Sequence, residues 1–226
     1  MRITPLHRWD VTPTEAVALQ RELADQLDTR TPLNRIKLVA GADISYNKFD
    51  PIMYATVVVY RLADGEIVEV QDSVAKATFP YVPGLLTFRE APAYLDAFAK
   101  LQTVPDAVMF DGQGYAHPRR FGLASHLGLW LGLPTIGCAK SRLCGQFREP
   151  RKTAGSLSPL KDGKAQIGYA VRTKQSCKPI FVSVGNGIDL DSAVRAVLAA
   201  GRGYRIPEPT RLAHLRVNEL RRKAAC

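Results

Sequence analysis

The chain has 226 residues, of which 46% are hydrophobic and 23% charged, so it can bury a full core as a single domain over residues 1–226. Its four cysteines show neither C-x-x-C pairing nor zinc spacing, which argues against a disulfide framework and a zinc finger. The N-terminus lacks an apolar signal core, and the uncharged stretch 121–139 is broken by glycines, His126 and Pro134, so we expect a cytoplasmic protein with no membrane partner.

The formal net charge is +10, and most of it lies in one window. Residues 137–178 hold ten lysines and arginines against only Glu149 and Asp162, which gives this window a net charge of +8. Such a concentration of positive charge suits a polyanion such as nucleic acid, through phosphate contacts and counterion release. A solvated surface that promotes solubility is the alternative.

The first half of the chain predicts two helices and an antiparallel meander of three strands. Periodicity and turn signals place the helices at 14–27 and 91–101 and the strands at 35–46, 54–60 and 66–77. Thr14 is a candidate cap of the first helix, and Asp64-Gly65 turns the second strand into the third. Asp43 lies within the first strand, where a carboxylate is costly unless it is paired or holds a cation.

The loop at residues 79–84 carries one aromatic side chain between two prolines. Pro80 and Pro83 fix φ on either side of Tyr81, so the loop is expected to be stiff. A stiff loop with a Tyr can act as a wedge that enters a base stack. The alternative is a connector in which Tyr81 covers the core.

A capping-box pattern, S/T-x-x-E, follows at Thr87-Phe-Arg-Glu90 and predicts the start of the second helix. Glu90 is then either a cap or a carboxylate that the first helical turn presents to a metal ion.

The strand predicted at 106–111 ends on Asp111, which is followed by a Gly-x-Gly sequence, a Tyr, a His and two Arg. Substrates usually meet an α/β sheet at the carboxyl ends of its strands, although an ordinary Asp-Gly turn is the alternative. If this strand pairs beside the first strand, Asp43 and Asp111 become neighbours. Two adjacent carboxylates repel each other but are tolerable around Mg²⁺ or Mn²⁺, the ions of phosphodiester hydrolysis by metal-activated water.

The second half predicts helices at 121–131, 191–200 and 209–223, an irregular loop at 147–164, and strands at 134–139, 165–173 and 178–184. Lys140 ends the strand that should lie parallel to the Asp111 strand, where its ammonium can neutralise a scissile phosphate or orient a water. On the last helix Leu212, Leu215 and Leu220 are available for an apolar stripe. His214 can supply a nitrogen to a metal site or align a water, although a lone helical His is more often structural or exposed.

Five segments in order resemble the motifs of the endonuclease V family. They are AGADISY at 40–46, FPYVPGLLTFRE at 79–90, DGQGYAHPRRFGLA at 111–124, GCAKS at 137–141 and PTRLAH at 209–214. The resemblance spans residues 14–223 and implies an RNase H-like α/β fold, in which three antiparallel strands and then parallel strands form a mixed sheet flanked by helices.

The resemblance also implies a Mg²⁺-dependent DNA repair endonuclease, with Mn²⁺ as a substitute ion. Such an enzyme recognises deoxyinosine and hydrolyses the second phosphodiester bond 3′ to the lesion, leaving a 3′-hydroxyl and a 5′-phosphate. The implied partner is DNA that contains deoxyinosine, with inosine-containing RNA as a second candidate, and the implied state is a monomer.

Residue roles are carried over by motif. The implied metal ligands are Asp43, Glu90 and Asp111. Lys140 would contact the scissile phosphate, and His214 would lie close to the metal site or contribute to it. The implied wedge is Pro80-Tyr81-Val82-Pro83. The implied lesion pocket and its backbone contacts comprise Gly112, Gly114 and His117.

One motif departs from the family pattern. The family usually has Val-Ser-Pro-Gly-His and then a basic residue, whereas this chain has Val182-Ser-Val-Gly-Asn-Gly187. The change removes a His and a positive charge but leaves the acidic residues intact, so we expect nicking activity to be retained while lesion preference, strand grip or turnover can differ.

Two other functions fit part of the pattern. A catalytically idle RNase H-like protein that binds nucleic acid would also be basic, but it gains nothing from gathering carboxylates against a polyanion. A different RNase H-like enzyme, such as a hybrid nuclease or a junction resolvase, fits the acidic residues but not the Tyr81 loop.

Overall fold

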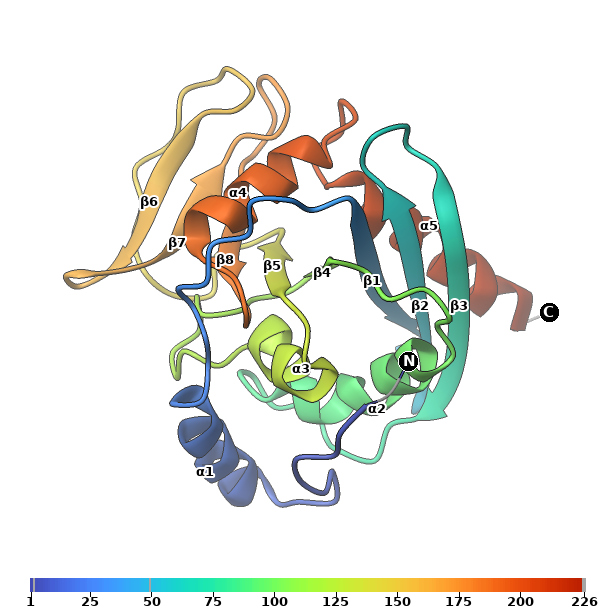
Figure 1. The fold of residues 1–226 in the computed structure, drawn as a ribbon. Helices are drawn as coiled ribbons and strands as arrows, with labels where there is room; N and C mark the ends of the chain where they lie inside the picture. Colours follow the sequence, from blue (N-terminus) through green and yellow to red (C-terminus); the bar gives the residue numbers. More distant parts are fainter. Residues whose placement is uncertain (2, 49, 225–226) are drawn as a thin grey trace.

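A mixed sheet of eight strands runs through the molecule in the order β3-β2-β1-β4-β5-β8-β7-β6 (Figure 1). The computed structural model describes residues 1, 3–48 and 50–224. The strands are Leu38–Tyr46 (β1), Ile52–Arg61 (β2), Ile67–Lys76 (β3), Ala107–Phe110 (β4), Thr135–Ala139 (β5), Leu157–Asp162 (β6), Ala165–Val171 (β7) and Ile180–Val184 (β8). Strands β1, β4 and β5 are parallel, and all other neighbours are antiparallel. The predicted meander is confirmed, and the fourth strand pairs beside the first, which is the condition for Asp43 and Asp111 to be neighbours.

Five helices within the described residues cover the two faces of this sheet (Figure 1). They are Pro13–Ala24 (α1), Leu86–Ala99 (α2), Leu123–Leu131 (α3), Leu190–Ala199 (α4) and Glu208–Ala224 (α5). Helices α2 and α3 pack on one face with α1 outside α3, whereas α4 and α5 pack on the other face. None of the described helices is both long enough and apolar enough to cross a membrane.

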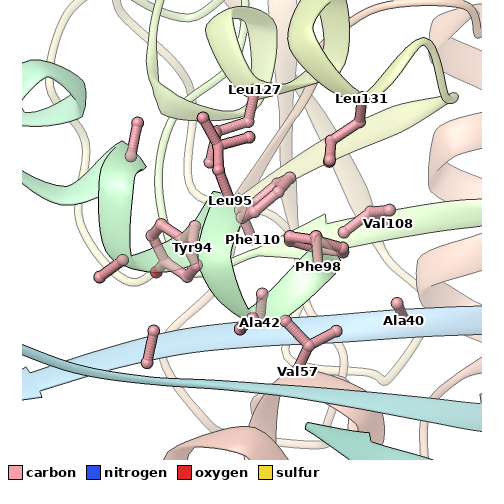
Figure 2. Close-up of a cluster of buried hydrophobic side chains, with 14 of the residues drawn as sticks. Ala40, Ala42, Val57, Tyr94, Leu95, Phe98, Val108, Phe110, Leu127 and Leu131 are labelled. Carbon is pink, nitrogen blue, oxygen red and sulfur yellow. The ribbon is translucent and has the colours of Figure 1, made fainter. Parts of the chain in front are cut away.

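The central strands are buried on both faces. Ala40 and Ala42 of β1 point into a cluster beneath α2 and α3, where Phe98 and Phe110 meet with ring centroids 5.9 Å apart (Figure 2). Val39 alternates to the other face and packs in the α4 cluster. Burial on both sides explains why these strands read as continuous apolar runs.

Helix α5 crosses β1 at very short range because Gly41 lies at the crossing point. A Cβ atom on Gly41 would lie 2.1 Å from the carbonyl carbon of Pro209 and 2.4 Å from the amide nitrogen of Thr210. Only glycine allows this approach. The crossing fixes Thr210 against β1, and His214 follows one helical turn later on the same side.

The predicted leucine stripe on this last helix is wrong at Leu215, which is 53% exposed. Ala213 and Val217 are buried instead. The close crossing at Gly41 leaves room for small side chains, so Ala and Val face the sheet.

Both predicted helix caps are wrong. Helix α1 is capped by Thr12, not Thr14: the Thr12 hydroxyl accepts from the Glu15 amide at 3.3 Å, and Pro13 suits the first helical position. Helix α2 begins at Leu86, before the predicted Thr87 capping box, and its N-terminus has no side-chain cap. Glu90 is therefore not a cap.

The segment predicted as an irregular loop at 147–164 contains β6, an edge strand that pairs with β7. Its Pro159 and its polar residues concealed it, since proline is tolerated in strands mainly at sheet edges. The later hairpin β7–β8 extends the sheet beyond β5, as predicted.

Candidate active site

The register of the sheet places the first two candidate carboxylates next to each other. Ala42 of β1 is paired with Phe110 of β4 in a parallel ladder, and the next residue along each chain is Asp43 and Asp111. The Asp43 side chain is 10% exposed and that of Asp111 is 16% exposed. Asp111 directly follows β4, and Asp43 lies within β1 just beyond its parallel pairing with β4, so both flank the carboxyl end of β4, where α/β sheets usually carry their sites.

Glu90 reaches the same region from helix α2, where the residue is only 7% exposed. Burial, and then the charges of Asp43 and Asp111, raises the pKa of the Glu90 carboxyl to about 8. Burial and the Asp111 charge likewise raise the pKa of Asp43, against the opposing hydrogen bond from His214. The three carboxylates therefore lie within electrostatic reach of one another and are costly to ionise together.

Two basic side chains contact this acidic cluster. The Lys140 ammonium, directly after β5, forms an ion pair with the Asp111 carboxylate. The imidazole of His214 on α5 donates from Nδ1 to Oδ2 of Asp43 at 2.7 Å. The five residues expected at the catalytic centre thus lie in one region, with Asp43 on β1, Glu90 on α2, His214 on α5, Asp111 directly after β4 and Lys140 directly after β5.

The acidic cluster is not a preformed coordination shell. Among the described residues no three His, Cys, Asp or Glu side chains stand close enough together to hold a metal ion. The donor chemistry does fit a divalent cation, because the carboxylates of Asp43, Glu90 and Asp111 are hard oxygen ligands and ionise together far more easily beside a positive charge.

The predicted wedge loop projects Tyr81 into solvent. This residue is 66% exposed, whereas Phe79 at the base of the loop is 3% exposed and packs with Leu85 and Phe88. Tyr81 therefore does not cover the core, and the connector alternative is wrong. The loop offers an exposed ring on an anchored base.

A cavity of about 450 Å³ lies between this loop and the acidic cluster. Its lining includes Tyr81, Val82, Pro83, Gly84, Asp111, Gly112, His117 and Lys140. Gly114 does not line the cavity. A Cβ atom there would lie 2.1 Å from the carbonyl oxygen of Val184, so Gly114 lets the loop after β4 pack closely against β8.

His117 braces the wedge loop from inside the cavity wall. Its Nε2 donates to the Gly84 carbonyl at 3.1 Å, and burial, followed by the charge of Arg119, lowers its pKa to about 4. Near neutral pH the imidazole is therefore uncharged. Arg119 and Gln20 donate to the same carbonyl at 2.8 and 3.0 Å, so three side chains hold Gly84 in place.

Comparison of the chain with known proteins identifies its family. The family model described as Endonuclease V matches residues 20–215. Endonuclease V of Dehalococcoides mccartyi is 48% identical over 220 residues, which cover 97% of this chain and 99% of that protein. The chain belongs to the endonuclease V family. Endonuclease V proteins are hydrolytic endonucleases that act on DNA, so the alternatives of an idle binder and of a hybrid nuclease or junction resolvase are not supported.

Solved endonuclease V structures share the fold. That of Streptomyces avermitilis superimposes with a TM-score of 0.92 at 41% identity, covering 96% of each chain. An endonuclease V of Ciona intestinalis, in complex with a 23mer DNA that contains an inosine followed by a ribo-adenosine, superimposes with a TM-score of 0.84 at 29% identity, covering 95% of this chain and 100% of that one. The predicted RNase H-like fold is confirmed.

Sequence reasoning missed two buried glutamines beside the endonuclease V cavity. Gln20 lies on the buried face of α1 with Ala16 and Leu23, and this spacing on an otherwise apolar face was the available signal. Gln113 donates to the Ser141 carbonyl at 2.8 Å and so joins the loop after β4 to the loop after β5. No sequence pattern pointed to that bond.

The departure from the endonuclease V motif after β8 has a structural role. Asn186 accepts from the Asp28 amide at 3.0 Å, and the Gly187 amide donates to the Asp28 carbonyl at 2.7 Å. Asn186 and Gly187 thus connect the segment between α1 and β1 to the end of β8, and neither residue lines the cavity.

Proposed function

We propose that this chain is a Mg²⁺-dependent DNA repair endonuclease that recognises deoxyinosine. It hydrolyses the second phosphodiester bond on the 3′ side of the lesion and leaves a 3′-hydroxyl and a 5′-phosphate, and Mn²⁺ can replace Mg²⁺. The observation that carries the proposal is that the carboxylates of Asp43, Glu90 and Asp111 lie within electrostatic reach of one another, beside a cavity that an exposed Tyr rims. The inosine-containing DNA bound by the Ciona intestinalis relative supports the choice of substrate.

The carboxylates of Asp43, Glu90 and Asp111 would hold the divalent ion. When bound, such an ion lowers the pKa of a coordinated water and offsets charge on the phosphate oxygens. His214 orients the Asp43 carboxylate through its 2.7 Å hydrogen bond. Lys140 faces both the Asp111 carboxylate and the cavity, which suits an ammonium that stabilises negative charge developing on the scissile phosphate.

Recognition uses the opposite wall of the cavity. A base inside a duplex is out of reach, so an enzyme that inspects it separates it from its neighbours and binds it in a pocket. The exposed ring of Tyr81 fills the gap in the stack, and the cavity beside it takes the displaced base. Neutral His117 keeps the loop rigid without adding charge to the pocket.

A nicking assay tests the proposal. Duplexes with a single deoxyinosine, matched undamaged duplexes and inosine-containing RNA are incubated with Mg²⁺ or with EDTA, and the products are mapped to the nucleotide. We expect one nick at the second bond 3′ to inosine, only with the metal. Asp111→Ala should abolish it, whereas Asp96→Ala, at an exposed position of α2 that does not line the cavity, should not. Equal cutting of undamaged duplex, or cutting that survives EDTA, would refute the proposal.

A further inference from the structure

The β6–β7 hairpin and the adjoining segment 146–148 carry exposed cations that the fold does not use. Arg148 precedes β6, Lys161 lies near its end, and Lys164 lies in the turn to β7. All three residues are exposed. Within the part of the chain that the structure describes, none of the three side chains has an ion pair or a hydrogen bond to another residue. Stability therefore does not require their charges.

The acidic residues of this region do not offset these three cations, because each acidic residue already pairs with an arginine from another segment of the chain. Asp162 pairs with Arg120 from the loop after β4 at 2.6 Å. Glu149 pairs with the buried Arg172 of the segment after β7, also at 2.6 Å. The hairpin surface is left with uncompensated positive charge.

This surface is continuous with the candidate active site. Residues 141–143 line the cavity, and the same segment continues to Gln146, which pairs with Lys161 through two backbone hydrogen bonds of 2.6 and 2.9 Å. Arg148 and Lys161 line a shared recess on the hairpin. The Arg120–Asp162 ion pair joins the hairpin turn to the loop that carries His117. The hairpin is thus held in a fixed position relative to the cavity.

We propose that the β6–β7 hairpin and the adjoining segment 146–148, through Arg148, Lys161 and Lys164, bind the phosphate backbone of duplex DNA flanking the lesion. The inference rests on the proposed function for the identity of the polyanion. Contacts of this kind position the duplex without reading its sequence. They give affinity that falls steeply with salt, because each contact releases counterions.

The test compares the wild type with Arg148→Gln/Lys161→Gln/Lys164→Gln in equilibrium binding to inosine-containing and undamaged duplexes over a series of salt concentrations. Three lost phosphate contacts should reduce the slope of log K against log salt by about 2 to 3 and weaken binding at least about 10-fold at low salt. The rate of nicking at saturating enzyme should stay unchanged, because none of the three residues lines the catalytic cavity.

Two further variants serve as controls. Arg148→Lys/Lys161→Arg/Lys164→Arg keeps the charges and should keep the slope. Arg35→Gln/Lys37→Gln removes exposed charges just before β1, at the end of the sheet opposite the cavity, and should bind like the wild type.

The duplex is then shortened on each side of the lesion in turn. On the side that the hairpin contacts, shortening should weaken DNA binding by the wild type to the level of the triple variant and leave binding by that variant unchanged. An unchanged slope in the triple variant would overturn the inference even if nicking is normal. A reduced slope in a protein that fails to nick inosine would uphold the inference and refute the proposed function.

Discussion

Glu90 should make the metal-free protein less stable as the pH rises. Its folded pKa of about 8 lies above the ordinary value of 4.5, so between these values the folded protein binds a proton more tightly than the unfolded chain does. The stabilisation is complete below pH 4.5 and is lost as the pH rises through 8. At about 1.4 kcal/mol per pH unit the interval corresponds to about 5 kcal/mol, or a fall in Tm of about 10 °C or more for a chain of this length.

Glu90→Gln isolates this effect because glutamine keeps the shape and cannot ionise. Thermal unfolding in EDTA from pH 5 to 9 should show a declining Tm for the wild type and a much flatter profile for Glu90→Gln, which should be the more stable protein at pH 9. Glu22→Gln, at an exposed position on α1, should follow the wild type. Mg²⁺ at pH 9 should raise the wild-type Tm more than that of Glu90→Gln. Parallel profiles for the wild type and Glu90→Gln would refute the reasoning.

Three other substitutions test separate parts of the site. Tyr81→Ala should leave the Tm within about 1 °C, since the ring is 66% exposed, but should weaken binding to inosine duplex more than to single-stranded inosine DNA; equal losses would contradict a wedge. Gly41→Ala should destabilise the fold by about 1–3 kcal/mol or more and lower the rate of nicking, because the new Cβ would lie 2.1 Å from the carbonyl carbon of Pro209. An unchanged denaturation midpoint would show that the position of α5 does not depend on this close crossing. Lys140→Met should slow single-turnover nicking about 100-fold with little change in DNA affinity, and a normal rate would remove Lys140 from the chemistry.

Local sequence signals predicted the sheet better than they predicted the helix ends. The strand alternation and the Asp64-Gly65 turn gave the meander, and the helix between two apolar runs gave the parallel crossover. The Thr12 cap was missed although Thr12-Pro-Thr-Glu15 fits the capping box and Pro13 suits the first helical position. The Thr87 box failed because α2 begins one residue earlier, at Leu86. Strand β6 was missed since its stability comes from pairing with β7 rather than from its own polar sequence.

Some features of the candidate site could likewise be predicted from the sequence, and others could not. The placing of Asp43 beside Asp111 required the fourth strand to pair with the first, a condition that the sequence stated and the sheet fulfils. The link from His214 to Asp43 depends on how closely α5 crosses β1, which the sequence did not indicate. The triple hydrogen bonding of the Gly84 carbonyl joins residues from three distant segments and leaves no pattern in the sequence.

Divalent-ion binding to Asp43, Glu90 and Asp111 is best tested by titrating the protein with Mn²⁺ and following free Mn²⁺ by electron paramagnetic resonance. The wild type and Glu22→Gln should bind with the same affinity, and Asp43→Asn, Glu90→Gln and Asp111→Asn should each bind at least about 10-fold more weakly, since each loses a charged ligand. Equal Mn²⁺ affinity in the wild type and all three variants would show that these carboxylates do not form the metal site.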